Sequence, residues 1–305
     1  RVIVERVRRG GGNDDERVSC AITPLLKEKG ILTGDHVTFC EIIAGDTVAT
    51  NNTAGRKGFV TERLERKTLL ERPAKAFADV DPAELLARGG DQALNAGGGR
   101  KLMCANVDQM LIVIAPRPMA PPLLLDSHIV AATTAGIEPV IVLNKCDLLG
   151  EAAPEGGTLG DLLPDLQVYA NLGYPVVRLS TKSMDGVADL EDVLRDKTSI
   201  MVGQSGVGKS SLVNMLFPQE KMRVGDLSEY SGLGSHTTTH AELHHIPSGG
   251  DLIDCAGFRD FGTWHLTRDE IQMGFKEIFE RSFKCKYRNC AHWKEPECAV
   301  KEGVE

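Results

Sequence analysis

The most constraining feature of this sequence is the order of two nucleotide-binding motifs. The loop "GQSGVGKS", residues 203–210, matches the G-x-x-x-x-G-K-[ST] pattern of a phosphate-binding loop. The tetrapeptide "NKCD", residues 144–147, is of the kind that reads guanine, and it precedes the loop by more than fifty residues. In ordinary guanine-nucleotide-binding domains the phosphate loop comes first. The sequence therefore predicts a circular permutation, in which sheet and site are kept and the chain is cut elsewhere.

The phosphate loop supplies backbone N–H groups and a cation. Its glycines let successive N–H groups turn inward, and the N-terminus of the helix expected after it adds positive potential. Lys209 is expected to reach the β- and γ-phosphates, and the Ser210 hydroxyl to ligate Mg²⁺. A glycine-rich turn without a ligand is the alternative, and the strand-like and helix-like flanks disfavour it. The expected nucleotide-binding residues here are Gly203, Gln204, Ser205, Gly206, Val207, Gly208, Lys209, Ser210 and Ser211.

The tetrapeptide indicates that the base is guanine. Asp147 can accept hydrogen bonds from guanine N1–H and the 2-amino group, Asn144 can address the N7/O6 edge, and the stem of Lys145 can lie over the ring. Buried hydrogen bonds of this kind reject a wrong base strongly. The motif follows the apolar run "VIVL", at the strand end where open α/β sheets bind ligands. A turn that supports the base is expected at Ser180, Thr181 and Lys182.

Two later segments match switch elements. "SHTTTH", residues 235–240, provides Thr238 or a neighbouring threonine to close over the γ-phosphate and ligate Mg²⁺. "DCAG", residues 254–257, is a D-x-x-G element, with Asp254 near the metal and the Gly257 N–H at the γ-phosphate. For each segment an ordinary polar loop or turn is the alternative.

None of these motifs supplies the residue that orients the attacking water. Phe258 stands where many GTPases have a glutamine, and its ring cannot make a hydrogen bond, so intrinsic hydrolysis is expected to be slow. His236 is the candidate substitute, because a neutral imidazole can hold water in line. A loop histidine with no catalytic role is the alternative. The expected catalytic residues are His236, Lys209 and Gly257.

A cysteine-rich segment follows near the end of the chain. It contains the pattern Cys285-x4-Cys290-x-His292-x5-Cys298, and three thiolates with one imidazole can wrap one tetrahedral Zn²⁺. A closed set of four ligands with no acidic base nearby indicates a structural ion. A redox or disulfide cluster is the alternative, but a reducing cytosol disfavours it and it leaves His292 unexplained.

Basic and aromatic residues are interleaved around these cysteines. Five Lys or Arg and no acid occur over 281–294, together with Phe283, Tyr287 and Trp293. A patch of this kind suits RNA phosphates and base stacking.

Composition limits the function class. The net charge of −8 over 305 residues gives no support to bulk nucleic-acid binding, and no DNA partner is expected. No apolar run approaches the ~20 residues that cross a bilayer. The cysteines outside the cluster resemble small buried hydrophobes in a reducing cytosol, so a cytoplasmic protein is expected. The chain is also expected to be a monomer.

The pattern of apolar and polar runs along the chain predicts three domains. Residues 1–100 carry short alternating runs such as 18–22, 36–43, 46–50 and 58–64, which favour an OB-like β-barrel. Residues 101–264 alternate apolar runs with helical stretches, which indicates a parallel sheet covered on both faces. Residues 265–305 open with a helix over 267–281, capped by Thr267 and Glu270, and continue into the cysteine cluster.

The order of these motifs resembles the RsgA (YjeQ) family of circularly permuted GTPases, which depend on the small ribosomal subunit. "GFVTERLERKTLLERP", "GIEPVIVLNKCDLL", "GQSGVGKSSLVN" and "GSHTTTH" all resemble family segments. Departures are "DCAG", where the family usually has Thr-Pro or Ser-Pro before the glycine, and Thr181 in place of alanine.

The resemblance implies a fold class and a function. The fold class is multidomain α/β, with an N-terminal OB-like β-barrel, a circularly permuted P-loop GTPase domain and a C-terminal helical zinc-binding domain. The implied function is hydrolysis of GTP to GDP, with Mg²⁺ and one structural Zn²⁺, activated by the small ribosomal subunit and its rRNA late in subunit maturation. An RNA-binding protein with a non-catalytic guanine nucleotide site is the alternative; a metabolic P-loop kinase is disfavoured by "NKCD".

Overall fold

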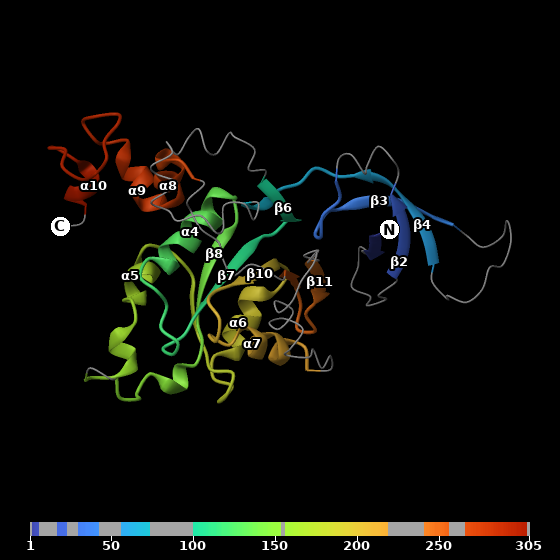
Figure 1. Ribbon diagram of the computed structural model, residues 1–305, viewed down its shortest axis with the longest axis horizontal. Helices are drawn as coiled ribbons and strands as arrows, with labels where there is room; N and C mark the ends of the chain where they lie inside the picture. Colours follow the sequence, from blue (N-terminus) through green and yellow to red (C-terminus); the bar gives the residue numbers. More distant parts are fainter. Residues whose placement is uncertain are drawn as a thin grey trace, which may run out of the picture.

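The structure, a computed structural model, describes residues 2–5, 17–22, 30–42, 56–73, 100–153, 156–218, 241–255 and 266–303. Figure 1 shows a central domain with a small N-terminal sheet at one end and the C-terminal helices at the other. No helix in the described part of the chain has the length and apolar character that a bilayer crossing requires. The predicted multidomain α/β fold class is confirmed.

The central domain is built on a six-stranded sheet. Its order is β11-β12-β10-β7-β8-β9, and every pairing is parallel except the antiparallel β11–β12 edge. The strands are β7 (Gln109–Ile114), β8 (Glu138–Leu143), β9 (Val176–Arg178), β10 (Thr198–Val202), β11 (Ala241–His245) and β12 (Asp251–Cys255). The apolar runs expected as strands are all present, whereas β11 was not expected, because "AELHH" is not apolar.

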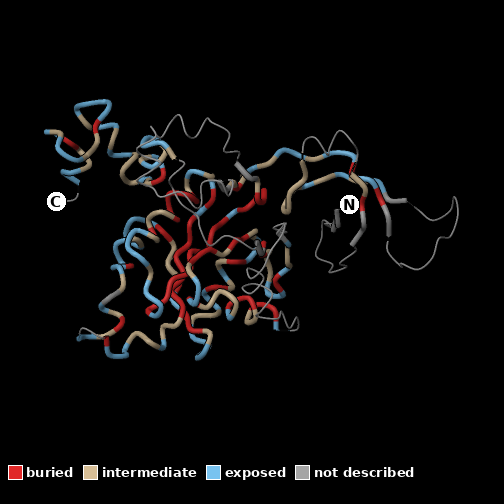
Figure 2. Tube along the Cα trace, in the orientation of Figure 1, coloured by how far each residue is buried: buried red, intermediate tan, exposed pale blue. Residues whose placement is uncertain are grey.

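Helices cover both faces of this sheet, as the continuous apolar strands predict. Along β7, Met110 and Ile112 enter the core under α4, while Leu111 and Val113 enter the opposite core under α6 and α7, following the two-residue period of a strand. Figure 2 shows the buried residues concentrated along these strands. The helices are α4 (Leu124–Thr134), α5 (Leu166–Asn171), α6 (Val187–Leu194) and α7 (Lys209–Leu216), with short 3-10 turns η2 (Cys146–Leu148) and η3 (Leu159–Leu162).

The described N-terminal strands form a mixed four-stranded sheet in the order β1-β2-β4-β3. The runs expected at 18–22, 36–43 and 58–64 are confirmed as strands, and the run at 46–50 lies outside the described residues. An antiparallel pair, β5 with β6, links this sheet to the central domain, and β6 crosses the expected domain boundary at residue 100. The bounds are β1 (Val2–Glu5), β2 (Arg17–Ile22), β3 (Val37–Ile42), β4 (Arg56–Arg63), β5 (Leu69–Pro73) and β6 (Arg100–Ala105).

The C-terminal segment is helical but contains a break that was not expected. Thr267 and Glu270 form the predicted capping box at the start of α8 (Arg268–Gly274). Phe275 then leaves the helical conformation, with φ −103° and ψ 100°, before α9 (Lys276–Ser282) begins. The single helix expected over 267–281 is therefore wrong; α10 (Ala299–Glu302) follows later.

The break coincides with the docking of α8 on α4. A Cβ at Gly274 would lie 2.6 Å from Cγ1 of Val130, so only a glycine permits this approach. Beyond the break, the Tyr174 hydroxyl donates a 2.9 Å hydrogen bond to Glu277. The C-terminal helices are thus held against the central domain at two points.

Candidate nucleotide site and metal centre

Three predicted site segments meet at one edge of the central sheet. Because β8, β9 and β10 are parallel, their carboxyl ends lie at the same edge. "NKCD" follows β8, the turn at Ser180 follows β9, and the phosphate loop follows β10 and leads into α7. The change in chain order therefore still leaves these three segments together at one edge of the sheet.

Glycines allow the phosphate loop to pack against its neighbours. Gly203 has φ 137°, and a Cβ there would lie 2.3 Å from the carbonyl oxygen of Val113. Gly208 has φ 100°, and a Cβ there would lie 2.3 Å from Nδ2 of Asn144. At both positions φ is positive, and a Cβ would clash with a neighbouring atom. Glycine is therefore required at each.

The Lys209 ammonium lies inside the curve of the loop. Its Nζ donates to the carbonyl oxygens of Gly203 at 2.5 Å and Gln204 at 2.8 Å. Lys209 also begins α7, so its charge stands at the positive end of the helix. This is the arrangement expected of a cation that receives phosphate groups. Of the two following hydroxyls, Ser210 is half-buried and Ser211 is exposed.

Asn144 holds the base-reading segment against the phosphate loop. Its side chain is fully buried, and Nδ2 donates to the carbonyl oxygen of Val207 at 2.9 Å. Its Oδ1 accepts from the N–H of Lys145 at 2.8 Å and of Thr181 at 3.4 Å. One amide thus connects all three segments. The expected contact of Asn144 with the guanine edge stays a prediction, and these hydrogen bonds within the protein are a second role for its amide.

Lys145 and Gln204 bind a fourth segment that was not expected in the site. Nζ of Lys145 donates to the carbonyl oxygens of Gly206 at 2.6 Å and Arg117 at 2.9 Å. Nε2 of Gln204 donates to the carbonyl oxygens of Pro118 and Met119, each at 2.8 Å. The loop after β7 is therefore one wall of the site. Its position at the carboxyl end of a parallel strand was the signal that could have located it.

Asp147 is oriented by the turn after β9. The hydroxyl of Ser180, which is buried, donates to Oδ1 of Asp147 at 2.6 Å. The same oxygen of Ser180 accepts from the N–H groups of Lys182 and Ser183, both at 3.2 Å. Nζ of Lys182 lies 3.9 Å from Oδ2 of Asp147. The carboxylate is thus fixed on one oxygen, and a fixed carboxylate is suited to reading paired N–H donors.

The switch residues lie mostly outside the described part of the chain. His236, Thr238 with its neighbours, Gly257 and Phe258 all fall there. The backbone of Asp254 is described, near the end of β12 and paired with Glu242 of β11. Since β12 is parallel to β10, Asp254 lies at the same sheet edge as the phosphate loop.

The four predicted metal ligands are brought together. The ligand atoms of Cys285, Cys290, His292 and Cys298 all lie within 4.8 Å of one another. Nδ1 of His292 is 3.4 Å from Sγ of Cys298 and 3.7 Å from Sγ of Cys285, and these two sulfurs are 4.0 Å apart. A tetrahedral Zn²⁺ with bonds of about 2.3 Å to sulfur and 2.0 Å to nitrogen would hold its ligand atoms roughly 3.4–3.8 Å apart. The cluster therefore fits one tetrahedral ion.

The thiols of this cluster differ in acidity. Burial raises the pKa of Cys290 to about 11. Burial also acts to raise the pKa of Cys298, but hydrogen bonds from the Lys301 N–H and from His292 outweigh it and lower the value to about 7. A thiol ionised near neutral pH favours metal binding, because the thiolate is the ligand.

A carboxylate shapes the loop that carries His292. Glu295 accepts hydrogen bonds from the N–H groups of Ala291 at 2.8 Å, Trp293 at 3.0 Å and Lys294 at 3.0 Å. The bonds from Ala291 and Trp293 help to lower the pKa of Glu295 to about 2. The same loop projects Trp293, 75% exposed, beside the basic residues expected to meet RNA. Of these residues, Lys286 is paired with Glu297.

The fold and the site together define the class of the protein. A phosphate loop and an N-K-x-D turn share one edge of a mostly parallel sheet, in permuted chain order, so this is a circularly permuted P-loop GTPase domain. The family model described as RsgA GTPase matches residues 64–264. The chain belongs to the RsgA GTPase family, as its motifs predicted.

Similar proteins support this assignment over the whole chain. A small ribosomal subunit biogenesis GTPase RsgA of Pseudomonas putida is 47% identical over 211 residues, which cover 69% of this chain and 60% of that protein. One of Alcanivorax borkumensis is 37% identical over 306 residues, covering 97% and 84%. The match to the first relative thus spans less than two thirds of its length.

Two solved structures are also similar. YjeQ from Thermotoga maritima has a TM-score of 0.63 and 29% identity, covering 95% of this chain and 84% of that one. YloQ, described as a circularly permuted GTPase, has a TM-score of 0.63 and 28% identity, covering 99% and 86%. The predicted permutation thus agrees with the description of YloQ.

Proposed function

We propose that this protein hydrolyses GTP to GDP and phosphate and that the small ribosomal subunit activates it. The observation that carries the proposal is the Asn144 amide, which binds Val207 of the phosphate loop and the N–H of Thr181 beside the base-reading Asp147. That connection supports a single site with a reader of guanine and a receiver of phosphates. The names of the relatives, which are small ribosomal subunit biogenesis GTPases, suggest the partner.

The base is read by groups that are already fixed. Oδ2 of Asp147, together with the remaining lone pairs of Oδ1, accepts N1–H and the 2-amino group of guanine while Ser180 holds the carboxylate in place. Adenine offers no such pair of donors. The stem of Lys145 lies alongside the base, since its ammonium is held by Gly206 and Arg117.

The phosphates are received by the loop and by Lys209. The Lys209 ammonium leaves the carbonyl oxygens of Gly203 and Gln204 for the β- and γ-phosphates. The N–H groups at the start of α7 add hydrogen bonds to phosphate oxygens, and Gly257 donates its N–H to the γ-phosphate. Water attacks the γ-phosphorus, the bond to the bridging oxygen of GDP breaks, and His236 orients the water. Since His236 lies in a switch segment, we expect the small subunit to order it.

Oxygen donors of the site suit Mg²⁺. We assign Ser210, Thr238 and Asp254 as its ligands, because hydroxyl and carboxylate oxygens are the donors that this ion prefers. When bound, Mg²⁺ neutralises charge that develops on the transferred phosphoryl group.

The Cys285–Cys298 cluster is assigned to one structural Zn²⁺. Its four donors fill a tetrahedron, which leaves no position for substrate. The ion would stabilise the loop that carries Trp293 and the basic residues of 281–294. We assign this surface to rRNA binding. The three domains are placed at 1–100, 101–264 and 265–305, with the chain acting as a cytoplasmic monomer.

Steady-state hydrolysis of GTP, with ATP as the control and with or without purified small ribosomal subunits, tests the proposal. We expect slow turnover of GTP alone, strong stimulation by small subunits, and no stimulation by large subunits. Tight GTP binding without turnover in any condition would favour the alternative, an RNA-binding protein whose nucleotide site is not catalytic.

A further inference from the structure

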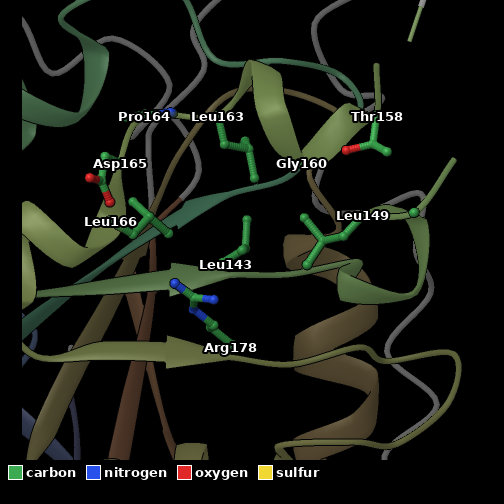
Figure 3. A pocket seen from close by; sticks show the side chains of 10 residues that line it. Leu143, Leu149, Thr158, Gly160, Leu163, Pro164, Asp165, Leu166 and Arg178 are labelled. Carbon is green, nitrogen blue, oxygen red and sulfur yellow. The ribbon is translucent and has the colours of Figure 1, made fainter. Parts of the chain in front are cut away.

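A pocket of about 560 Å³ lies behind the base-reading turn. Figure 3 shows its lining between β8, β9 and the segment that carries η3 and the start of α5. Leu143 and Leu149, which flank residues 144–147 in the sequence, both line it. Arg178, two residues before Ser180 in the sequence, lines it as well. None of the residues assigned to the nucleotide or to Mg²⁺ lines it, so it is a separate site.

The pocket is an open hollow whose lining is partly apolar. Five of its lining side chains are apolar and surround one space: Leu143, Leu149, Leu163, Pro164 and Leu166. Its volume falls within the range of ligand pockets, which are mostly apolar and contain a few polar groups that orient the ligand. A ligand here would bury a ring or a short chain against these leucines.

One cation in the lining is available to such a ligand. Arg178 is exposed and makes no hydrogen bond or ion pair with the described residues, and in Figure 3 its guanidinium extends from β9 towards the side of Leu143 and Leu166. A guanidinium binds carboxylates in a two-pronged geometry.

Two other polar side chains of the lining make hydrogen bonds within their own helix caps. Oδ1 of Asp165 accepts the N–H of Gln167 at 2.9 Å and so caps α5. The hydroxyl of Thr158 donates to Asp161 at 2.9 Å within its own capping box. Arg178 is therefore the lining side chain with N–H donors to offer, and a ligand anion would pair with it at a distance from the Asp165 carboxylate that also lines the pocket.

We propose that this pocket binds a small anionic amphiphile, an organic acid whose apolar body packs on the leucines and whose carboxylate pairs with Arg178. The site goes beyond GTP hydrolysis and does not depend on it. A ligand there would contact the residues on either side of the base-reading tetrapeptide.

Two matched probes test the proposal by calorimetric titration of the full chain: 4-phenylbutyrate and its uncharged amide, 4-phenylbutyramide. We expect the carboxylate to bind with one-to-one stoichiometry at millimolar concentration. In Arg178→Met, carboxylate binding should weaken about tenfold, which is the size of a charge-assisted hydrogen bond, while amide binding stays within about twofold. Arg195→Met removes an exposed cation that pairs with Asp192 away from the pocket, and it should change neither probe.

A second variant fills the space. A Cβ at Gly150 meets nothing within 4 Å, and this glycine lines the pocket, so we expect Gly150→Trp to fill part of it without a backbone clash. We expect Gly150→Trp to bind neither probe and to keep the wild-type affinity for GDP, which also reports that it is folded. No binding of the carboxylate to the wild-type chain, or equal binding to a folded Gly150→Trp, would overturn the proposal. Failure of the wild-type chain to bind GDP would instead count against the proposed function alone.

Discussion

The Asn144 amide and the carbonyl oxygen of Val207 lie 2.9 Å apart, although 63 residues separate them in the chain. This one hydrogen bond joins a motif that is normally late in a GTPase to one that is normally early. Because Asn144 is completely buried, the bond is shielded from water, and its loss would leave the Val207 carbonyl without this partner.

Replacing Asn144 should therefore damage the phosphate loop as well as base recognition. We expect Asn144→Ala to weaken binding of a fluorescent GDP analogue by about 10- to 100-fold, because it removes hydrogen bonds to three segments and each buried polar group left unpaired costs roughly 1–3 kcal/mol. The affinity for inorganic pyrophosphate, which has no base, should fall by a similar factor to the affinity for GDP. If pyrophosphate binding is unchanged, Asn144 acts on the base alone and the bracing role is wrong.

The glycine at position 208 should tolerate no side chain. In Gly208→Ala, the new Cβ meets Nδ2 of Asn144 at 2.3 Å and the backbone must keep φ at 100°. Both terms are unfavourable, so we expect nucleotide binding to be lost in equilibrium titrations. Gly150→Ala is the matched control, because its Cβ meets no atom within 4 Å. Equal GDP affinity in the two variants would contradict the loop geometry.

Metal removal should affect the C-terminal segment and spare the nucleotide site. Cys290 and Cys298 are buried but belong to neither core cluster of the central domain. We expect a strong chelator, or Cys290→Ser, to release one Zn²⁺ per chain and to unfold residues 285–298, because metal binding energy is folding energy in such a loop. Hydrogen exchange should report this loss while GDP affinity stays the same. Retained protection of the loop after complete metal loss would count against a structural ion.

Two tyrosines should ionise only under strongly alkaline conditions. Burial, with a hydrogen bond to Asp126, raises the pKa of Tyr169, and burial, with the neighbouring charge of Glu277, raises that of Tyr174. An unfolded tyrosine ionises near its ordinary pKa of 10, so the stability that these groups contribute is full below pH 10 and is lost as pH rises towards the folded values. The free energy of unfolding should fall above pH 10.

Phenylalanine variants separate the two tyrosines. Tyr174→Phe should reduce the fall in the free energy of unfolding above pH 10. It should also speed hydrogen exchange in α9, because the hydrogen bond to Glu277 is lost. Tyr169→Phe should flatten the loss without loosening α9, because its partner Asp126 is in α4. The measurements are chemical unfolding as a function of pH and hydrogen exchange of α9. An alkaline loss that neither variant reduces would contradict this assignment.

The main lines of the site could be predicted because the motifs constrain geometry. "NKCD" and the phosphate loop each follow a strongly apolar run, and parallel strands must bring their ends together. The metal cluster was equally predictable, since four ligands so close in sequence can meet with few loop residues between them.

The remaining features depend on tertiary contacts that no local pattern encodes. The helix break at Phe275 follows a periodic sequence, but the close approach of Gly274 to Val130 is a property of two distant segments. The role of Asn144 as a brace depends on a carbonyl in another loop. The segment 117–119 enters the site through its backbone carbonyls, which any sequence carries.

The most direct test of the central claim, that both motifs form one guanine nucleotide site, is competitive binding of GDP, ADP and xanthosine diphosphate to the wild type and to Asp147→Asn. Xanthine has a carbonyl where guanine has its 2-amino group, so the amide of Asp147→Asn can donate where the carboxylate could only accept. We expect the wild type to prefer GDP over ADP by at least about 10⁴-fold. We expect Asp147→Asn to lose its affinity for GDP and to bind xanthosine diphosphate instead. Unchanged preference in Asp147→Asn would show that the base is read elsewhere and that the permuted site described here is wrong.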